Sequence, residues 1–447
     1  MTALRVLLTA HRCLPEAIGG VERIVEALGR DLPRLGDTVT IVARRPGADQ
    51  REEMALLRER LGDRCTLFRL TGPTGGYGQM FLQHARLEQL YTSVLLETAP
   101  DVAHFLHLLH LSPAVLEIAY RQRVPIVVSL QDFYFACPLI HLRKPAGELC
   151  HGPNAGQECA QTCFAAEGAG ALQRWAVRAL YFRRLLDLAD AIVCPSQFVA
   201  DFFVRQQGLR PEQVRVVPNG IVPMARPARA SLSPRERGRL RLAFQGAVCP
   251  HKGVHVLLKA LELAELPAVQ LDINGTIHDF PDYVEGLRQM GKRIPGLDLR
   301  INGPYDLSSV PRLLQAVDCV VVPSQWPETF ALVSREALAQ GVPILVAHNG
   351  GLPEAIEPGV NGLTFEPDQP AELAGHLRAI WEDEALLNRL SRGAVRSAVM
   401  LTPEHAQRMH DLYSEVIDTY PQRQEGKAAI FAEVVVLRRL LMQLGFS

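Results

Sequence analysis

Short apolar runs alternate with longer segments of helical period along the whole chain. The runs are almost continuously apolar, which is typical of parallel strands covered on both faces. This alternation predicts an α/β fold with open, doubly wound parallel sheets. In the first part of the chain the expected strands are residues 4–9, 38–43, 102–106, 126–130 and 191–195, and the first expected helix is 20–35.

The alternation of strand and helix patterns stops after residues 214–219 and starts again near residue 241. Residues 223–241 are rich in Pro, Arg and Ser and poor in large apolar residues, which indicates an interdomain linker. The later expected elements are strands 241–245, 270–274, 297–302, 318–323, 343–347 and 362–365 and a helix at 253–263. We therefore expect two Rossmann-like domains with a cleft between them, spanning residues 1–222 and 223–402, followed by helices in 403–447. Ligands of such sheets bind beyond the carboxyl ends of the strands, so candidate residues are sought there.

Composition narrows the class of protein. The chain has 447 residues, of which 48% are hydrophobic and 21% charged, a balance typical of a globular protein with a sizeable core. The formal net charge of −1 gives no field that favours nucleic acid or an anionic membrane. No apolar run is long enough for a membrane span, and the first residues lack the pattern of a secretory leader, so we expect a cytoplasmic protein. Nine cysteines, an odd number, argue against a disulfide framework.

Two glycine-containing loops follow expected strands. Gly19 and Gly20 lie between the first strand and the first helix, where backbone amides and the helix dipole favour an anion. Gly246 follows a second-domain strand, and Lys252 lies just after it, where its ammonium can reach a phosphate. The alternatives are an ordinary strand-to-helix turn in the first loop and a surface lysine in the second.

The segment 324–336 follows an apolar strand and contains two glutamates eight positions apart. If a helix begins near residue 330, Glu328 lies in the loop before it and Glu336 about one turn inside. Carboxylates at these places can accept hydrogen bonds from ribose or sugar hydroxyls. The alternative is a solvated acidic helix start that complements the dipole.

The backbone of the same region offers further contacts. The amides of Phe330, Ala331 and Leu332 would be free at a helix start and would meet phosphate oxygens. The loop 349–354 follows the next strand, and its glycines permit close approach of a ligand. An ordinary turn and helix cap is the alternative for this loop.

In this order and spacing, these segments resemble the retaining glycosyltransferases of family 4, which have the GT-B fold. The resemblance covers nearly the whole chain, from Gly19 to the region after Glu354. Its strongest parts are the Glu-x7-Glu motif, the Gly-Gly-Leu-Pro-Glu loop, Lys252-Gly253 and the stretch 216–221.

The resemblance implies transfer of a sugar from a nucleoside-diphosphate-sugar to an acceptor hydroxyl with retained configuration, in glycan, glycolipid or natural-product glycoside synthesis. It implies no cofactor for catalysis. Glu336 would hold the ribose and Glu328 the donor sugar. The remaining donor contacts would come from Gly19, Gly20, Gly246, Lys252, the backbone of Tyr305 toward the base, and the amides of Phe330, Ala331 and Leu332.

Two positions depart from the family pattern. The family's strand-end arginine is replaced by Ala247, with Arg335 or His251 as possible substitutes. The family's His-Asp pair in the first domain becomes Gln131-Asp132. A Gln amide can donate to a sugar hydroxyl but cannot titrate near neutral pH.

On the acceptor side, Gln131 and Asp132 are therefore catalytic candidates together with Glu328. His107, which lies just after a first-domain strand, is a second choice for an acceptor-side polar group.

An insert follows Asp132 and is expected to border the acceptor site, as in a subset of the family that carries similar cysteine-containing inserts. It contains Cys137, Cys150, Cys159 and Cys163. Four thiols in a short loop can bind a structural zinc ion, although the spacing differs from that of a standard zinc knuckle. Free or redox-active thiols remain equally open, and an iron–sulfur cluster is the weaker alternative.

The last segment predicts two helices. Residues 403–420 are similar to the family's final helix, which returns to the first domain. Beyond them, apolar residues recur at helical spacing as an amphipathic helix, expected to pack on the protein itself. A peripheral contact with the inner face of a membrane, for a lipid-linked acceptor, is the alternative.

Other functions fit the same fold. A catalytically silent nucleotide-sugar-binding module is suggested by Ala247 and Gln131, although both Glu328 and Glu336 are retained. A nucleotide-sugar epimerase or a phosphorylase is a further alternative, because function depends on the site and not on the fold.

Overall fold

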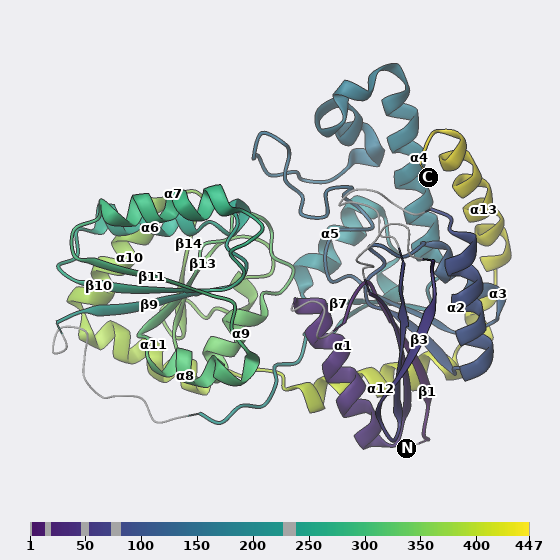
Figure 1. The fold of residues 1–447 in the computed structure, drawn as a ribbon, viewed down its shortest axis with the longest axis horizontal. Coiled ribbons are helices and arrows are strands. Elements are labelled where there is room, and N and C mark those ends of the chain that lie inside the picture. Colours follow the sequence, from purple (N-terminus) through teal and green to yellow (C-terminus); the bar gives the residue numbers. More distant parts are fainter. Residues whose placement is uncertain (1, 14–18, 46–52, 73–81, 227–237, 447) are drawn as a thin grey trace. The chain divides into compact units, whose positions relative to one another are not determined.

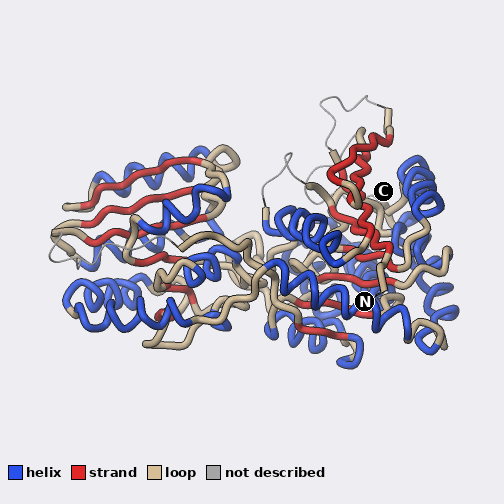
Figure 2. Tube along the Cα trace, turned by 90° about the horizontal axis from the view of Figure 1, so that it is seen from below, coloured by secondary structure: helices blue, strands red, loops and turns tan. Residues whose placement is uncertain are grey.

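The computed structural model describes residues 2–13, 19–45, 53–72, 82–226 and 238–446. The chain forms two compact units, one of residues 1–220 with 401–447 and the other of residues 221–400. In each unit, helices cover both faces of a sheet whose strands lie side by side (Figures 1 and 2).

The first unit contains an eight-stranded sheet of order β3-β4-β2-β1-β5-β6-β7-β8. Its neighbours pair in parallel, except for the antiparallel pair β3–β4 at one edge. The strands are β1 Arg5–Ala10, β2 Thr38–Arg44, β3 Leu56–Gly62, β4 Cys65–Leu70, β5 Val102–Phe105, β6 Ile126–Ser129, β7 Ala191–Cys194 and β8 Val214–Val216.

The helices of the first unit come from both ends of the chain. They are α1 Gly20–Asp31, α2 Ala85–Thr98, α3 Ala114–Arg121, α4 Ala171–Asp187, α5 Gln197–Gln207, α12 Thr402–Asp418 and α13 Lys427–Gln443. Helix α12 packs against α1, and α13 runs beside α4 (Figure 1). The buried ammonium of Lys427 donates to Asp190 Oδ1 at 2.6 Å and to the carbonyl of Leu188 at 2.8 Å, which fixes the start of α13.

The second unit contains a six-stranded parallel sheet of order β11-β10-β9-β12-β13-β14. Its strands are β9 Leu240–Gln245, β10 Val269–Asn274, β11 Leu297–Gly303, β12 Cys319–Val322, β13 Ile344–Ala347 and β14 Gly362–Phe365. Its helices are α6 Val254–Ala264, α7 Pro281–Lys292, α8 Val310–Gln315, α9 Leu332–Ala339, α10 Pro370–Glu382 and α11 Glu384–Arg396.

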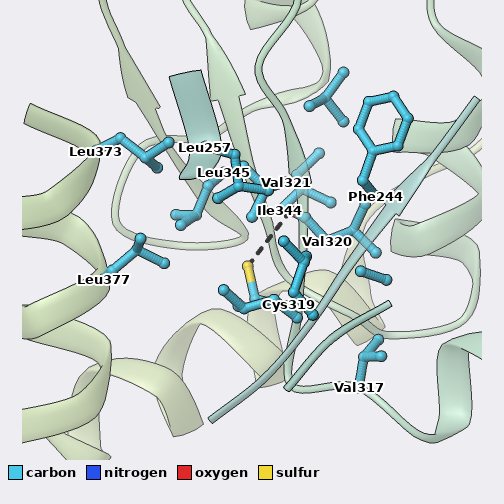
Figure 3. Close-up of a cluster of buried hydrophobic side chains, with 14 of the residues drawn as sticks. Phe244, Leu257, Val317, Cys319, Val320, Val321, Ile344, Leu345, Leu373 and Leu377 are labelled. Atoms are coloured by element: carbon cyan, nitrogen blue, oxygen red, sulfur yellow. Dashed lines mark hydrogen bonds between the residues drawn. The ribbon is translucent and has the colours of Figure 1, made fainter. Parts of the chain in front are cut away.

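The core of the second unit explains why its central strands are apolar on both faces. All four residues of β12 are buried, and they pack among side chains such as Phe244, Leu257 and Leu377 (Figure 3). Cys319 is part of this core, and its thiol donates to the carbonyl of Val320 at 3.5 Å. It occupies the place of a small hydrophobe.

The prediction of two doubly wound parallel sheets is confirmed, and the expected strands lie within about one residue of the observed ones. Two details differ. The edge pair β3–β4 was not predicted, and the first helix ends at Asp31, followed by a 3₁₀ turn at Leu32–Leu35. Pro33 explains the change, because proline cannot donate the backbone hydrogen bond that continues an α-helix.

Across the described residues, no helix combines the length and apolarity needed to cross a bilayer. The observed contact of α13 with α4 agrees with packing of this helix on the protein itself. Peripheral membrane contact stays a prediction.

The cysteine insert consists of short irregular turns between β6 and α4, among them a π-helical turn at Cys159–Cys163. Its cysteines are free thiols, and burial raises the pKa of Cys159 to about 12 and that of Cys163 to about 11. Within the described ranges, no three His, Cys, Asp or Glu side chains are placed to hold a metal ion. This placement gives the zinc hypothesis no support, and zinc binding stays a prediction for Cys137, Cys150, Cys159 and Cys163.

Candidate functional site

The Lys252 turn of the second unit lies directly against the loop that follows β12. Lys252 ends a 3₁₀ turn, and Gly253 follows with a φ of 75°. A Cβ at Gly253 would overlap the carbonyl oxygen of Pro323, so only glycine permits this approach. The amide of Gln325 donates to the carbonyl of His251 at 2.8 Å. These contacts hold the lysine beside the acidic motif, 76 positions later in the chain.

Lys252, which is half-buried, forms an ion pair with the buried Glu328. The lysine Nζ lies 2.6 Å from Glu328 Oε1 and 4.9 Å from the ring centroid of Trp326. The hydroxyl of Ser324 donates to the same carboxylate oxygen at 2.6 Å. Burial alone would raise the pKa of Glu328, but the charge and hydrogen bond of Lys252, with that of Ser324, bring it below its usual value. Glu328 is therefore an anion with a cation held against it.

Helix α9 begins at Leu332, four residues after Glu328. Its N-cap residue, Ala331, has a φ of 58°, which is uncommon for a residue with a side chain. The guanidinium of the buried Arg335 donates to the carbonyl of Phe330 and, at 3.1 Å, to the carbonyl of Gly351. Its Cζ also lies over the Phe330 ring, 4.0 Å from the ring centroid. Arg335 thus joins the start of α9 to the loop after β13.

That loop lies on the backbone of Glu328. The amide of Gly351 donates to the Glu328 carbonyl at 2.6 Å. Gly350 has a φ of 64°, and a Cβ there would overlap the backbone of Glu328. The two glycines therefore allow close packing between two loops of the protein, and the expected approach of a ligand to this loop stays a prediction.

The remaining donor-side candidates lie in the same unit. Glu336 is fully buried in α9, one turn after its start at Leu332. Gly246 directly follows β9, and Tyr305 lies half-buried two residues after β11, against the core of this unit. Their expected contacts with a nucleotide stay predictions.

The two suggested substitutes for the arginine missing at Ala247 differ in their surroundings. The guanidinium of Arg335 is engaged by the two carbonyls described above. His251 lies next to Lys252, with Nε2 at 3.2 Å from the thiol of Cys249 and its ring edge-on to Trp326. Of the two, His251 is better placed beside the lysine.

In the first unit, the acceptor-side candidates meet at the carboxyl ends of β5 and β6. His107 Nε2 lies 2.6 Å from Asp132 Oδ2, and the amide of Tyr134 donates to Asp132 Oδ1 at 2.8 Å. The amide of Leu109 donates to His107 Nδ1 at 3.0 Å. A carboxylate only accepts hydrogen bonds, so the proton of His107 is on Nε2 and the lone pair of Nδ1 is already used. His107 orients Asp132 and has no acceptor atom left for a ligand.

Gln131 has a partner that the sequence did not suggest. Its side-chain amide forms reciprocal hydrogen bonds with that of Asn219, at 3.2 and 2.9 Å. Asn219 belongs to the stretch 216–221, which carried part of the family resemblance. This pair connects the end of β6 to the last loop of the first 220 residues.

Gly19 and Gly20 lie at the start of α1, as the N-cap and first helical residue. Residues 14–18 of the same motif lie outside the described residues. The first turn of α1 also carries Glu22, whose Oε1 lies 3.2 Å from Nε2 of His11, just after β1. Neither residue was a candidate, although a histidine immediately after a strand and a glutamate in a first helical turn are usable signals.

Comparison with known proteins relates both units to glycosyltransferases. Residues 18–223 match the family model described as Glycosyltransferase Family 4, and residues 233–396 match the model described as Glycosyl transferases group 1. Both compact units of the chain thus match glycosyltransferase family models. The D-inositol 3-phosphate glycosyltransferase of Nocardioides sp. is 30% identical over 254 residues, covering 52% of this chain and 55% of that protein. The glycogen synthase of Mycobacterium tuberculosis is 29% identical over 279 residues, covering 60% of this chain and 63% of the relative.

The chain thus spans little more than half the length of these curated relatives. Solved structures match over nearly the full chain. Sucrose-phosphate synthase from Thermosynechococcus elongatus has a TM-score of 0.69 at 19% identity, covering 93% of this chain and 100% of that one. HepE from Anabaena, solved in complex with UDP and glucose, has a TM-score of 0.62 at 19% identity, covering 92% and 99%. These likenesses confirm the GT-B fold.

Proposed function

We propose that this chain transfers a sugar from a nucleoside-diphosphate-sugar to an acceptor hydroxyl, with retention of the anomeric configuration. The observation that supports this most is the assembly of Lys252, Glu328 and the N-terminus of α9 in the second unit. One cation, one oriented carboxylate and a set of helix-start amides are the groups that a diphosphate joined to a sugar requires.

The ion pair suggests how the donor would be held. A diphosphate at the start of α9 would attract the ammonium of Lys252 away from Glu328, because it carries more negative charge than the carboxylate. Glu328 would then accept hydrogen bonds from the sugar hydroxyls, while Ser324 keeps it oriented. As the glycosidic bond breaks, Lys252 and the α9 amides would stabilise the charge that grows on the leaving diphosphate. No resident cofactor is needed for these steps.

The base and sugar of the donor are also a proposal. HepE was solved with UDP-glucose, so a uridine donor is the first to test. The acceptor is a hydroxyl compound bound by the first unit at the ends of β1, β5 and β6. The proposed donor contacts are those of Gly19, Gly20, Tyr305 and the amides of Phe330, Ala331 and Leu332. The proposed acceptor-side residues are Gln131 and Asp132.

A donor screen tests this function. Purified protein would be mixed with uridine-, guanosine- and adenosine-diphosphate glucose, and release of the nucleoside diphosphate would be followed. We expect release from one donor, a loss of at least 100-fold in Glu336→Ala, and little change in the control Glu366→Ala, whose side chain is 63% exposed in the same unit. Binding without release for every donor would instead support a silent binding module, and conversion of the donor sugar without an acceptor would support an epimerase.

A further inference from the structure

Four titratable side chains form a row at the carboxyl end of the first sheet. Glu22 comes from the first turn of α1, His11 follows β1, His107 follows β5 and Asp132 follows β6. The His11 and Glu22 side chains approach to 3.2 Å and those of His107 and Asp132 to 2.6 Å. The two imidazole rings lie 4.5 Å apart, centroid to centroid. Two carboxylate–imidazole pairs therefore meet ring to ring.

The two imidazoles differ in what they can still bind. His107 has both nitrogens engaged, by Asp132 and by the Leu109 amide. His11 uses Nε2 toward Glu22, and its Nδ1 is buried and has no hydrogen-bond partner anywhere in the described residues. Because Glu22 as a carboxylate can only accept, the proton of a neutral His11 belongs on Nε2, and Nδ1 carries a lone pair.

The charge state of this row favours that arrangement. Burial and the neighbouring His107 lower the pKa of His11 in spite of Glu22, so the ring is neutral at pH 7. Burial would raise the pKa of Glu22, but the hydrogen bond and charge of His11 bring it below its usual value. A buried acceptor atom without a partner is rare in native proteins and calls for a ligand or a water molecule.

We propose that Nδ1 of His11 accepts a hydrogen bond from the acceptor hydroxyl that receives the sugar, and that Glu22 positions the ring for this contact. The proposal rests on the glycosyl transfer proposed above and adds a second dyad, His11 and Glu22, to the acceptor-side residues Gln131 and Asp132. His107 is then a positioning residue for Asp132, and His11 is the imidazole that touches the substrate. The ligand class is a neutral alcohol, such as a sugar or polyol hydroxyl, because a hydroxyl supplies the donor that Nδ1 lacks.

The test compares transfer with donor hydrolysis, since water replaces the alcohol in hydrolysis. With the donor found in the screen, transfer to glycerol, myo-inositol and methyl α-D-glucopyranoside would be measured beside hydrolysis. We expect His11→Leu to lower kcat/KM for the best alcohol roughly 10- to 100-fold while donor affinity and hydrolysis change less than threefold. His11→Asn places an amide oxygen near the position of Nδ1 and should recover part of the loss. Glu22→Gln keeps an acceptor for Nε2 and should lose less transfer than Glu22→Leu.

A matched control and a second readout keep the outcome clear if a variant is unstable. His104 lies buried on β5 with both ring nitrogens bonded, to Tyr413 and Ser129 at 2.7 Å, so His104→Asn should alter stability without altering the transfer-to-hydrolysis ratio. Nitrogen-15 NMR of the unaltered protein should show His11 as the Nε2–H tautomer at pH 7. An Nδ1–H tautomer, or an unchanged transfer-to-hydrolysis ratio in His11→Leu, would overturn the assignment. Absence of turnover by the unaltered protein with every donor would refute the proposed function and this assignment together.

Discussion

Replacing Arg335 with methionine tests whether this side chain holds the proposed donor site together. The guanidinium makes two charge-assisted bonds to the carbonyls of Phe330 and Gly351, each contributing about 1.5–3 kcal/mol, and a cation–π contact contributing about 0.5–2 kcal/mol. Burial lowers the pKa of Arg335 to about 10, which corresponds to a cost of about 3 kcal/mol for keeping it charged. Subtracting this cost leaves a net loss of roughly 0.5–5 kcal/mol for Arg335→Met.

Two assays measure that loss. The midpoint of thermal unfolding of the second unit should fall by roughly 1–20 °C, at about 2–4 °C per kcal/mol for a domain of this size. The affinity for UDP by calorimetry should fall about tenfold, because the start of α9 and the loop on Glu328 lose their common anchor. Arg288→Met is the control, since that arginine is 44% exposed in α7 of the same unit. An unchanged unfolding temperature together with unchanged UDP affinity would refute the reasoning.

Three further changes have defined outcomes. Lys427→Met leaves the buried Asp190 carboxylate without its cation. Urea unfolding should then show that the free energy of unfolding of the first unit is lower by about 3–5 kcal/mol. A decrease below about 1 kcal/mol would contradict the importance of this ion pair. Burial lowers the pKa of His405 to about 4, so only the unfolded state binds a proton at this residue between pH 6.5 and 4. The free energy of unfolding should therefore be unaffected by this residue above pH 6.5 and should fall by about 2 kcal/mol at pH 5. His405→Leu should make the urea midpoints at pH 7.5 and pH 5.0 more alike. Gly350→Ala should abolish donor turnover while Gly359→Ala keeps it, because both glycines have positive φ but only Gly350 touches the backbone of Glu328; equal activities would contradict this packing argument.

The central strands were predictable because they are buried on both faces and therefore apolar throughout, as β12 and β13 are. Strand β3 was not predictable, since six of its seven residues are exposed and three are charged, as an antiparallel strand at a sheet edge allows. Burial pattern alone does not distinguish such a strand from a polar loop.

The candidate residues lie where their chain positions predicted, at the carboxyl ends of strands in both sheets, and their role in binding stays a prediction. The contacts between these side chains could not be predicted from the sequence, because folding brings distant segments together. Lys252 contacts Glu328, and Gln131 contacts Asn219, only in the folded chain. The orientation of Arg335 was equally hidden, since an arginine one position before Glu336 is as compatible with a solvent-facing helix surface. His11 and Glu22 gain meaning only from their contact with each other.

The division of the first unit between the two ends of the sequence constrains how a ribosome can produce it. Helix α12 supplies His410 to the buried Asp37 at 2.9 Å and Tyr413 to His104 at 2.7 Å, so the first sheet lacks core partners until residues after 401 emerge. The second unit is continuous in sequence and can complete its folding earlier, during translation. The nascent chain therefore holds an unfinished amino-terminal sheet while roughly 200 further residues are synthesised, and its apolar strands stay without their last core partners for that time.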